Sequence, residues 1–219
     1  MRTTKIKLCG MMRECDIDFA NEAKPDYVGF IFADTRRKIT PEQAITFRTK
    51  LSDDIMAVGV FVNENVDVVA NIANSNAIDI IQLHGNEDEK YISLLKSKIN
   101  NKKIFKAVRV FAPQQIVNAA GLDVDALLLD AYRKGVPGGT GECFNWELIN
   151  DAFKLAGNKD KKGKICNKPY FMAGGIDITN YKEAMSLNPY GLDISSGIET
   201  DGKKDRTKMI ELVRRIRNV

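Results

Sequence analysis

The chain has 219 residues, of which 44% are hydrophobic and 28% are charged, and its formal net charge is +4 at pH 7. These values are ordinary for a soluble globular protein, and we expect one domain over residues 1–219 that buries its core without disulfides or metals. The small positive charge is spread along the chain, which suits an anionic ligand and argues against a nucleic-acid surface.

Other classes of protein are disfavoured by what the sequence lacks. It contains no apolar run near the about 18 residues that span a membrane, and its first residues do not read as a secretory signal. The four cysteines lack CxxC spacing, and His84 is the only histidine. We therefore expect a cytoplasmic protein with free thiols, without a bound metal or cofactor, and without nucleic-acid or membrane partners.

Short apolar segments alternate with segments of helical periodicity along the whole chain, which predicts eight strand–helix units. Thr40 and Pro41 are the expected cap and first residue of one helix, and the first helix is expected to start near Asp16. The predicted strands are Ile6–Cys9, Tyr27–Phe32, Met56–Val62, Ile78–Leu83, Ile104–Val108, Ala126–Asp130, Pro169–Ala173 and Tyr190–Ser195. The other predicted helices cover residues 41–51, 65–74, 87–97, 112–120, 145–156, 178–187 and 204–217.

Two α/β architectures fit this alternation, a (β/α)8 TIM barrel and an open doubly wound sheet. The open sheet usually carries a Gly-rich turn after its first strand, whereas Cys9-Gly10-Met11-Met12 contains no GxGxxG. Polar residues follow predicted strands 1, 6, 7 and 8, and a barrel brings those strand ends to one rim. We therefore predict the barrel. The polar, lysine-rich segment Gly157–Lys168 precedes strand 7 and is expected to be a solvated loop on the opposite face.

Strand 1 alternates so that Lys5, Lys7 and Cys9 face the barrel interior. A lysine there needs an acidic partner, and Asp193 or Asp130 can supply it. An ammonium group near Cys9 would lower the pKa of its thiol and make it a general base. A small buried hydrophobic residue is the alternative reading of Cys9.

Asp130 ends the apolar strand Ala126–Asp130 and shares the inward face with Ala126 and Leu128. Partly apolar surroundings would raise the pKa of its carboxyl group, as suits a general acid, although a carboxylate in this place can also cap a turn. His84 follows strand 4, and we interpret it as a rim residue that supports the site rather than as the base.

Two turns after strands 7 and 8 indicate an anion site. Gly174 and Gly175 form the first turn, and Ser195 and Ser196 with Gly197 form the second. The loops after these two strands are the recurrent phosphate site of TIM barrels, where backbone N–H groups approach the anion. Ordinary turn glycines are the alternative.

Arginines follow strand 2 in Asp34–Lys38, at the same rim. Arg36 or Arg37 could hold a carboxylate through two hydrogen bonds, or the loop could be only solvated. Gly138–Gly141, after strand 6, is expected to form a rim loop that acts as a lid.

Taken together, these segments resemble the phosphoribosylanthranilate isomerases of tryptophan biosynthesis, in order and over residues 5 to about 205. The matching stretches are Lys7–Gly10, Val28–Phe32, Arg37 with Ile39–Pro41, Val58–Asn63, Gln82–Gly85, Leu128–Asp130, Gly138–Gly141 with Phe144 and Trp146, Ala173–Gly175, and Gly191–Gly197 with Glu199.

The resemblance implies an Amadori rearrangement of N-(5-phosphoribosyl)anthranilate to 1-(2-carboxyphenylamino)-1-deoxyribulose 5-phosphate, without a cofactor. It implies that Asp130 is the general acid, Cys9 is the general base and Arg37 binds the anthranilate carboxylate. It also implies that Asp193 lies near the sugar hydroxyls, and that the phosphate is held by Gly174, Gly175, Ser195 and Ser196. The expected partner is a small phosphorylated substrate, and the protein is expected to be a monomer or a homodimer.

Three other functions fit the sequence less well. A ribulose-phosphate epimerase is expected to bind a metal through paired histidines, which the chain lacks. An indole-glycerol-phosphate synthase would need a catalytic Lys or Glu on strands 2 and 3, where Phe30–Phe32 and Gly59–Phe61 stand. A noncatalytic phosphoribosyl-binding protein would lack the acid or the base, and both are present.

Overall fold

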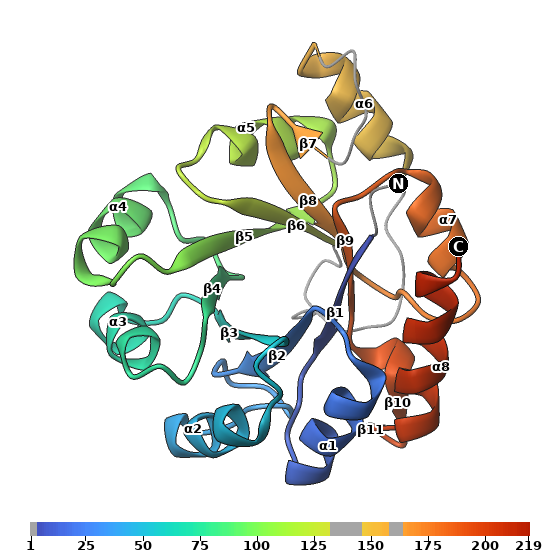
Figure 1. Cartoon of the computed structure of the whole chain (residues 1–219). Helices are drawn as coiled ribbons and strands as arrows, with labels where there is room; N and C mark the ends of the chain where they lie inside the picture. The colour runs from blue at the N-terminus through green and yellow to red at the C-terminus, as the bar shows by residue number, and fades with distance from the viewer. Residues whose placement is uncertain (1–3, 132–145, 158–163) are drawn as a thin grey trace.

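Eight parallel strands close into a barrel in the computed structural model, which describes residues 4–131, 146–157 and 164–219. Strand β1 pairs with β2 on one side and β9 on the other, and β6 pairs with β8, so the barrel has no open edge. Figure 1 shows the strands at the centre and the helices around them. The barrel prediction is confirmed, and the open sheet is excluded. The barrel strands are β1 (Lys5–Cys9), β2 (Tyr27–Ile31), β3 (Met56–Phe61), β4 (Ile80–Leu83), β5 (Lys103–Val110), β6 (Ala126–Ala131), β8 (Lys168–Met172) and β9 (Gly191–Ile194).

The helices begin where local capping chemistry favours it. Thr40 accepts a hydrogen bond from the Gln43 backbone N–H at 3.2 Å, and the Gln43 side chain accepts one from the Thr40 N–H at 2.9 Å, so helix α2 starts at Pro41 as predicted. The helices are α1 (Glu14–Ala23), α2 (Pro41–Lys50), α3 (Val66–Asn74), α4 (Glu89–Lys98), α5 (Pro113–Gly121), α6 (Glu147–Leu155), α7 (Tyr181–Ser186) and α8 (Arg206–Arg217). Over the described ranges, none of them is long and apolar enough to cross a membrane.

Helix α1 begins two residues earlier than predicted. The Asp16 carboxylate accepts hydrogen bonds from the backbone N–H groups of Met12 and Arg13, at 2.9 and 3.0 Å. Asp16 therefore caps the helix from its third position, and Glu14 is the first helical residue.

Two apolar cores lie on either side of the barrel wall. Outward residues such as Ile6 and Leu8 pack against the helices, while the interior of the barrel holds Tyr27, Phe105 and Phe171. The Tyr27 and Phe171 rings meet edge to face with centroids 5.7 Å apart. The interior around these rings is thus a packed core and not a pore.

The prediction of a solvated loop over Gly157–Lys168 is wrong in its last part. Strand β7 (Lys164–Ile165) pairs antiparallel with the start of β8, and Ile165 is fully buried. Cys166 and Asn167 form the two-residue turn, with φ of +48° and +67°, as tight hairpins require. Two residues are too few to show strand periodicity in the sequence. Residues 158–163 of the segment lie outside the described residues.

A second short hairpin follows the last barrel strand and was also missed. The 3-10 helix η1 (Ser196–Ile198) leads into β10 (Glu199–Thr200), which pairs antiparallel with β11 (Lys203–Lys204). The hairpin stands at the rim formed by the carboxyl ends of the strands, where it contributes to the candidate site.

Candidate active site

Cys9 ends strand β1 with its side chain on the inner face of the barrel, as the alternation predicts. It is buried and packs with Ile31 of β2 and Val60 of β3. Gly29 makes room for the thiol, since a Cβ on Gly29 would lie 2.5 Å from the sulfur of Cys9. The thiol is therefore closely packed against apolar side chains at the rim.

The partner of Lys7 is Asp193 and not Asp130. Lys7 and Asp193 stand opposite each other in the register of β1 and β9, and Lys7 Nζ lies 2.8 Å from Asp193 Oδ1. The Lys7 side chain is completely buried and that of Asp193 nearly so. A closed barrel makes β9 the neighbour of β1, which is why the acid on β9 reaches this lysine.

The hypothesis that Lys7 leaves Cys9 with a lowered pKa is contradicted. Burial raises the pKa of the Cys9 thiol, and the opposing effects of Lys7 and Lys204 only reduce that rise, while Asp193 adds to it. The ammonium of Lys7 is largely neutralised by Asp193, so desolvation of the thiolate dominates. In the free protein at neutral pH, Cys9 is therefore a thiol.

Asp130 is the last residue but one of β6 and is buried. Its Oδ2 lies 3.0 Å from His84 Nε2, and His84 Nδ1 lies 2.9 Å from Nε2 of the Gln82 amide. Because β4 and β6 flank β5, this contact crosses the inner face and shows that Asp130 points inward. His84 thus supports the carboxyl group, as the sequence indicated. Within the described residues Gln82 Oε1 is buried without a hydrogen-bond partner.

The two arginines after β2 differ in their surroundings. Arg37 is only 8% exposed, whereas Arg36 is 51% exposed. Arg37 Nε and Nη2 donate to the Glu199 carboxylate at 2.7 and 3.0 Å. Its aliphatic part lies over Gly10, because a Cβ on Gly10 would stand 2.6 Å from Arg37 Cδ. Arg37 is therefore the buried arginine of the two, and it lies beside Gly10, the residue that follows Cys9.

The two glycine-containing turns after β8 and β9 lie directly against each other. Gly174 and Gly175 adopt φ of +81° and +69°, which favours glycine. A Cβ on Gly197 would stand 2.1 Å from the Ile176 carbonyl oxygen, so only glycine permits this close approach. The predicted cluster of both turns at one place is observed.

The hydrogen-bond donors of these turns are backbone groups more than hydroxyls. The Ser195 hydroxyl donates a hydrogen bond to the Cys9 carbonyl at 3.1 Å, which connects the end of β9 to β1. The hydroxyl proton of Ser195 is therefore already used. Over the described residues, the N–H groups of Gly174 and Ser196 have no hydrogen-bond partner. Half-buried N–H groups of this kind suit an anion.

Comparison with known proteins decides the family. The family model described as N-(5'phosphoribosyl)anthranilate (PRA) isomerase matches residues 6–215. The chain belongs to the phosphoribosylanthranilate isomerase family. A relative from Endomicrobium trichonymphae, named N-(5'-phosphoribosyl)anthranilate isomerase, is 44% identical over 216 residues, covering 98% of this chain and 99% of the relative.

Solved phosphoribosylanthranilate isomerases share the architecture. The crystal structure from Thermus thermophilus superposes with a TM-score of 0.82 at 26% identity, covering 97% of this chain and 98% of that one. Another, in complex with reduced 1-(o-carboxyphenylamino)-1-deoxyribulose 5-phosphate, has a TM-score of 0.79 at 26% identity and covers 99% and 100%. The prediction of an isomerase of tryptophan biosynthesis is confirmed at the level of the family.

Sequence reasoning missed three charged residues at the rim of the barrel. Arg109 stands on the inner face of β5, in register with Asp130, and the same alternation that identified Asp130 could have found it. Glu199 was noted only as part of a motif. Lys204 carried no sequence signal, because its burial depends on the β10–β11 hairpin.

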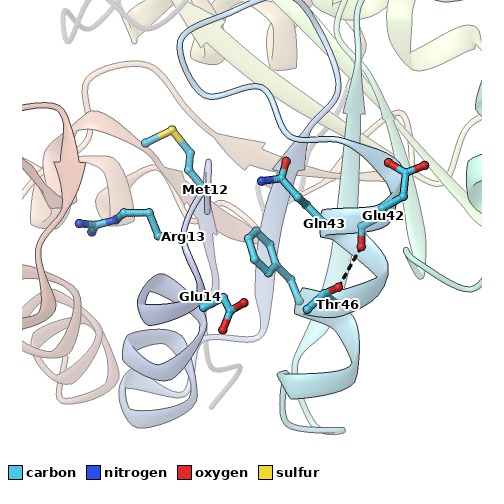
Figure 2. A pocket seen from close by; sticks show the side chains of 7 residues that line it. Met12, Arg13, Glu14, Glu42, Gln43 and Thr46 are labelled. Atoms are coloured by element: carbon cyan, nitrogen blue, oxygen red, sulfur yellow. Dashed lines mark hydrogen bonds between the residues drawn. The ribbon is translucent and has the colours of Figure 1, made fainter.

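One prediction falls on residues that the structure does not describe, and one cavity is lined by other residues than the predicted site. The predicted lid, Gly138–Gly141, falls outside the described residues. A cavity of about 350 Å³ lies between the loop after β1 and the start of α2 (Figure 2), where Gln43 extends toward that loop and the Thr46 hydroxyl donates to the Glu42 carbonyl at 3.1 Å. None of the predicted site residues lines it. The cavity therefore carries no part of the site.

Proposed function

We propose that the chain converts N-(5-phosphoribosyl)anthranilate to 1-(2-carboxyphenylamino)-1-deoxyribulose 5-phosphate, with Asp130 as general acid and Cys9 as general base. The observation that carries the proposal is the placement of a thiol and a carboxyl group on the inner face of one rim, on strands β1 and β6. On the shorter path around the barrel, β8 and β9 lie between these strands, so the two groups face the mouth from different sides.

In the first step Asp130 protonates the ring oxygen of the furanose. The bond between that oxygen and C1′ breaks, and the nitrogen lone pair forms an iminium ion. His84 Nε2, 3.0 Å from the Asp130 carboxylate, stabilises the negative charge that remains on the acid. The contact also keeps Asp130 in one orientation, which favours transfer of the proton to a fixed position.

In the second step Cys9 removes the proton from C2′, and the electron pair forms an enolamine with the iminium carbon. Loss of the C2′ hydroxyl proton and protonation of C1′ then give the ketone, so no oxidant or reductant is consumed. The iminium charge beside the thiol favours the thiolate, which offsets the burial that keeps Cys9 protonated in the free protein.

The remaining groups are assigned to the ends of the substrate. Arg37 would bind the anthranilate carboxylate, because its side chain is buried beside Gly10, whereas the Arg36 side chain is half exposed. The turns at Gly174-Gly175 and Ser195-Ser196 would hold the phosphate through backbone N–H groups. Asp193 would lie near the sugar hydroxyls while it neutralises Lys7.

Loss of anthranilate fluorescence during turnover tests the proposal. We expect Cys9→Ala and Asp130→Asn to lower kcat by at least about 100-fold, the usual contribution of acid–base catalysis. Cys15→Ala and Asp123→Asn are matched controls, because Cys15 lies on α1 and the Asp123 side chain is 79% exposed. Normal turnover by either active-site variant would contradict the assigned roles.

The pH profile tests the thiol separately. Because burial raises the pKa of Cys9, the rate at which an alkylating reagent modifies Cys9 in the free protein should still be rising with pH above the neutral range. A plateau reached below neutral pH would exclude a base with the properties of this thiol.

A further inference from the structure

A buried carboxylate at the rim is surrounded by three cations. Glu199 Oε1 lies 2.7 Å from Arg37 Nε and 2.8 Å from Lys204 Nζ, and Oε2 lies 3.0 Å from Arg37 Nη2. Arg36 Nη2 also donates to Oε2. We call Arg36, Arg37, Glu199 and Lys204 the Glu199 cluster. It joins the loop after β2 to the hairpin after β9.

The Glu199 cluster carries more positive charge than its carboxylate neutralises. Burial by itself would raise the pKa of Glu199, but hydrogen bonds from Arg37, Lys204 and Arg36 lower it to about 2. One negative charge therefore faces three positive ones. Burial, together with the charge of Arg37, lowers the pKa of Lys204. A second anion at this place would relieve the excess charge.

Glu199 uses only one edge of the Arg37 guanidinium. A guanidinium has five N–H donors and two edges that can each hold a carboxylate through two hydrogen bonds. Glu199 occupies the Nε–Nη2 edge. Over the described residues, Arg37 Nη1 makes no hydrogen bond and is not enclosed, so the Nη1–Nη2 edge is open. Glu199 thus fixes the plane of Arg37 and leaves one edge for a ligand.

The other members hold Glu199 in turn. Arg36 Nη1 donates to the Gly202 carbonyl at 2.6 Å, and Lys204 Nζ donates to the Ser195 carbonyl at 2.9 Å. Lys204 therefore connects the Glu199 cluster to the turn assigned to the phosphate. Gly10 supports Arg37 from the other side, where a Cβ would collide with its side chain.

We propose that Glu199 is a positioning residue that sets the specificity for a substrate bearing an aromatic carboxylate, by holding the open edge of Arg37 toward it. The inference rests on the proposed function and deepens it. A role limited to tying the hairpin to the loop after β2 would stabilise the fold without affecting which ligands bind. The two roles predict different responses to a ligand that lacks the carboxylate.

The test compares two ligands by titration calorimetry. The probes are reduced 1-(o-carboxyphenylamino)-1-deoxyribulose 5-phosphate and the corresponding reduced aniline compound without the ring carboxylate. We expect Glu199→Gln to weaken binding of the first by about tenfold or more, as loss of a partner from a buried charge pair does. We expect binding of the second to change less than about twofold, since it makes no use of Arg37.

Control variants keep the test interpretable. Glu22→Gln removes a different glutamate from an arginine, the exposed Arg206 on α8, and should leave both ligands bound as in the wild type. Glu199→Asp keeps the charge and should restore part of the preference. If Glu199→Gln does not fold, Glu199→Asp gives the same comparison at smaller amplitude.

Three outcomes would overturn the inference. Equal weakening of both ligands would show a structural role alone, and unchanged binding of the carboxylate ligand would show no role. A wild-type protein that binds both ligands equally would instead refute the carboxylate contact in the proposed function. Turnover of the wild type, followed by fluorescence, separates that failure from a failure of the activity itself.

Discussion

The buried pair of Lys7 and Asp193 offers the sharpest test of the energetics of the barrel. Replacing Lys7 by Met keeps an unbranched side chain one atom shorter and leaves the Asp193 carboxylate buried without its cation. Loss of one partner from a buried pair costs about 3–5 kcal/mol. For a chain of this size, that loss corresponds to a fall in Tm of roughly 6–20 °C.

The double variant Lys7→Met/Asp193→Leu distinguishes the net contribution of the ion pair from the cost of leaving one charge buried alone. With both charges removed, the free energy of unfolding should return to within about 1 kcal/mol of the wild type, because apolar replacements of buried pairs are often neutral. Urea unfolding followed by circular dichroism measures the two single variants, Lys7→Met and Asp193→Leu, and the double variant. Lys5→Met is the control on the same strand, since the Lys5 side chain is 40% exposed. It should lower the free energy of unfolding by less than about 1 kcal/mol.

The same variant tests the charge acting on the thiol. Lys7 lowers the pKa of Cys9 against the effect of burial, so Lys7→Met should raise that pKa further. The pH dependence of alkylation measures the pKa of Cys9 in a background where the other three cysteines are serine.

Two outcomes of the unfolding experiment would refute the reasoning on the ion pair. One is a Lys7→Met variant as stable as the wild type. The other is a double variant whose loss of unfolding free energy equals the sum of the losses in both single variants.

Three further predictions follow from named contacts. Gly10→Ala should raise KM about tenfold, because its Cβ would displace Arg37; an unchanged KM in the fluorescence assay would contradict this. The lowered pKa of Glu199 contributes stability that is present above its ordinary pKa and is lost as the pH falls toward 2. Between about pH 5 and 2, the free energy of unfolding in urea should therefore fall less for Glu199→Gln than for the wild type, by up to about 3 kcal/mol. Parallel plots of that free energy against pH would disprove the prediction. Cys166→Asn should raise Tm by about 1–3 °C, because asparagine tolerates φ of +48° better; a lower Tm in calorimetry would count against it.

The sequence predicted the longer elements best, because their residues are numerous enough to show a period. Each barrel strand was located to within a few residues, and the alternation in β1 and β6 correctly turned Cys9 and Asp130 inward. The start of α1 was misplaced because Asp16 looks like a first residue but acts from the third position. The hairpins at β7 and at β10–β11 were missed because two-residue strands have no period to detect.

Contacts between distant segments could not be read in the same way. The sequence left two acids open for Lys7, and closure of the barrel selected Asp193 by making β9 the neighbour of β1. It left two arginines open for the carboxylate, and the structure buried Arg37 and exposed Arg36. Cytoplasmic location, oligomeric state and the roles of the individual catalytic groups remain predictions.

The sequence by itself determined the barrel and the set of polar groups at its rim, because alternation and strand order depend only on local residue patterns. The tertiary structure alone decided which charges meet and which state of the thiol prevails. Pairing and desolvation depend on atoms from strands far apart in the chain, and those atoms come together only when the barrel closes.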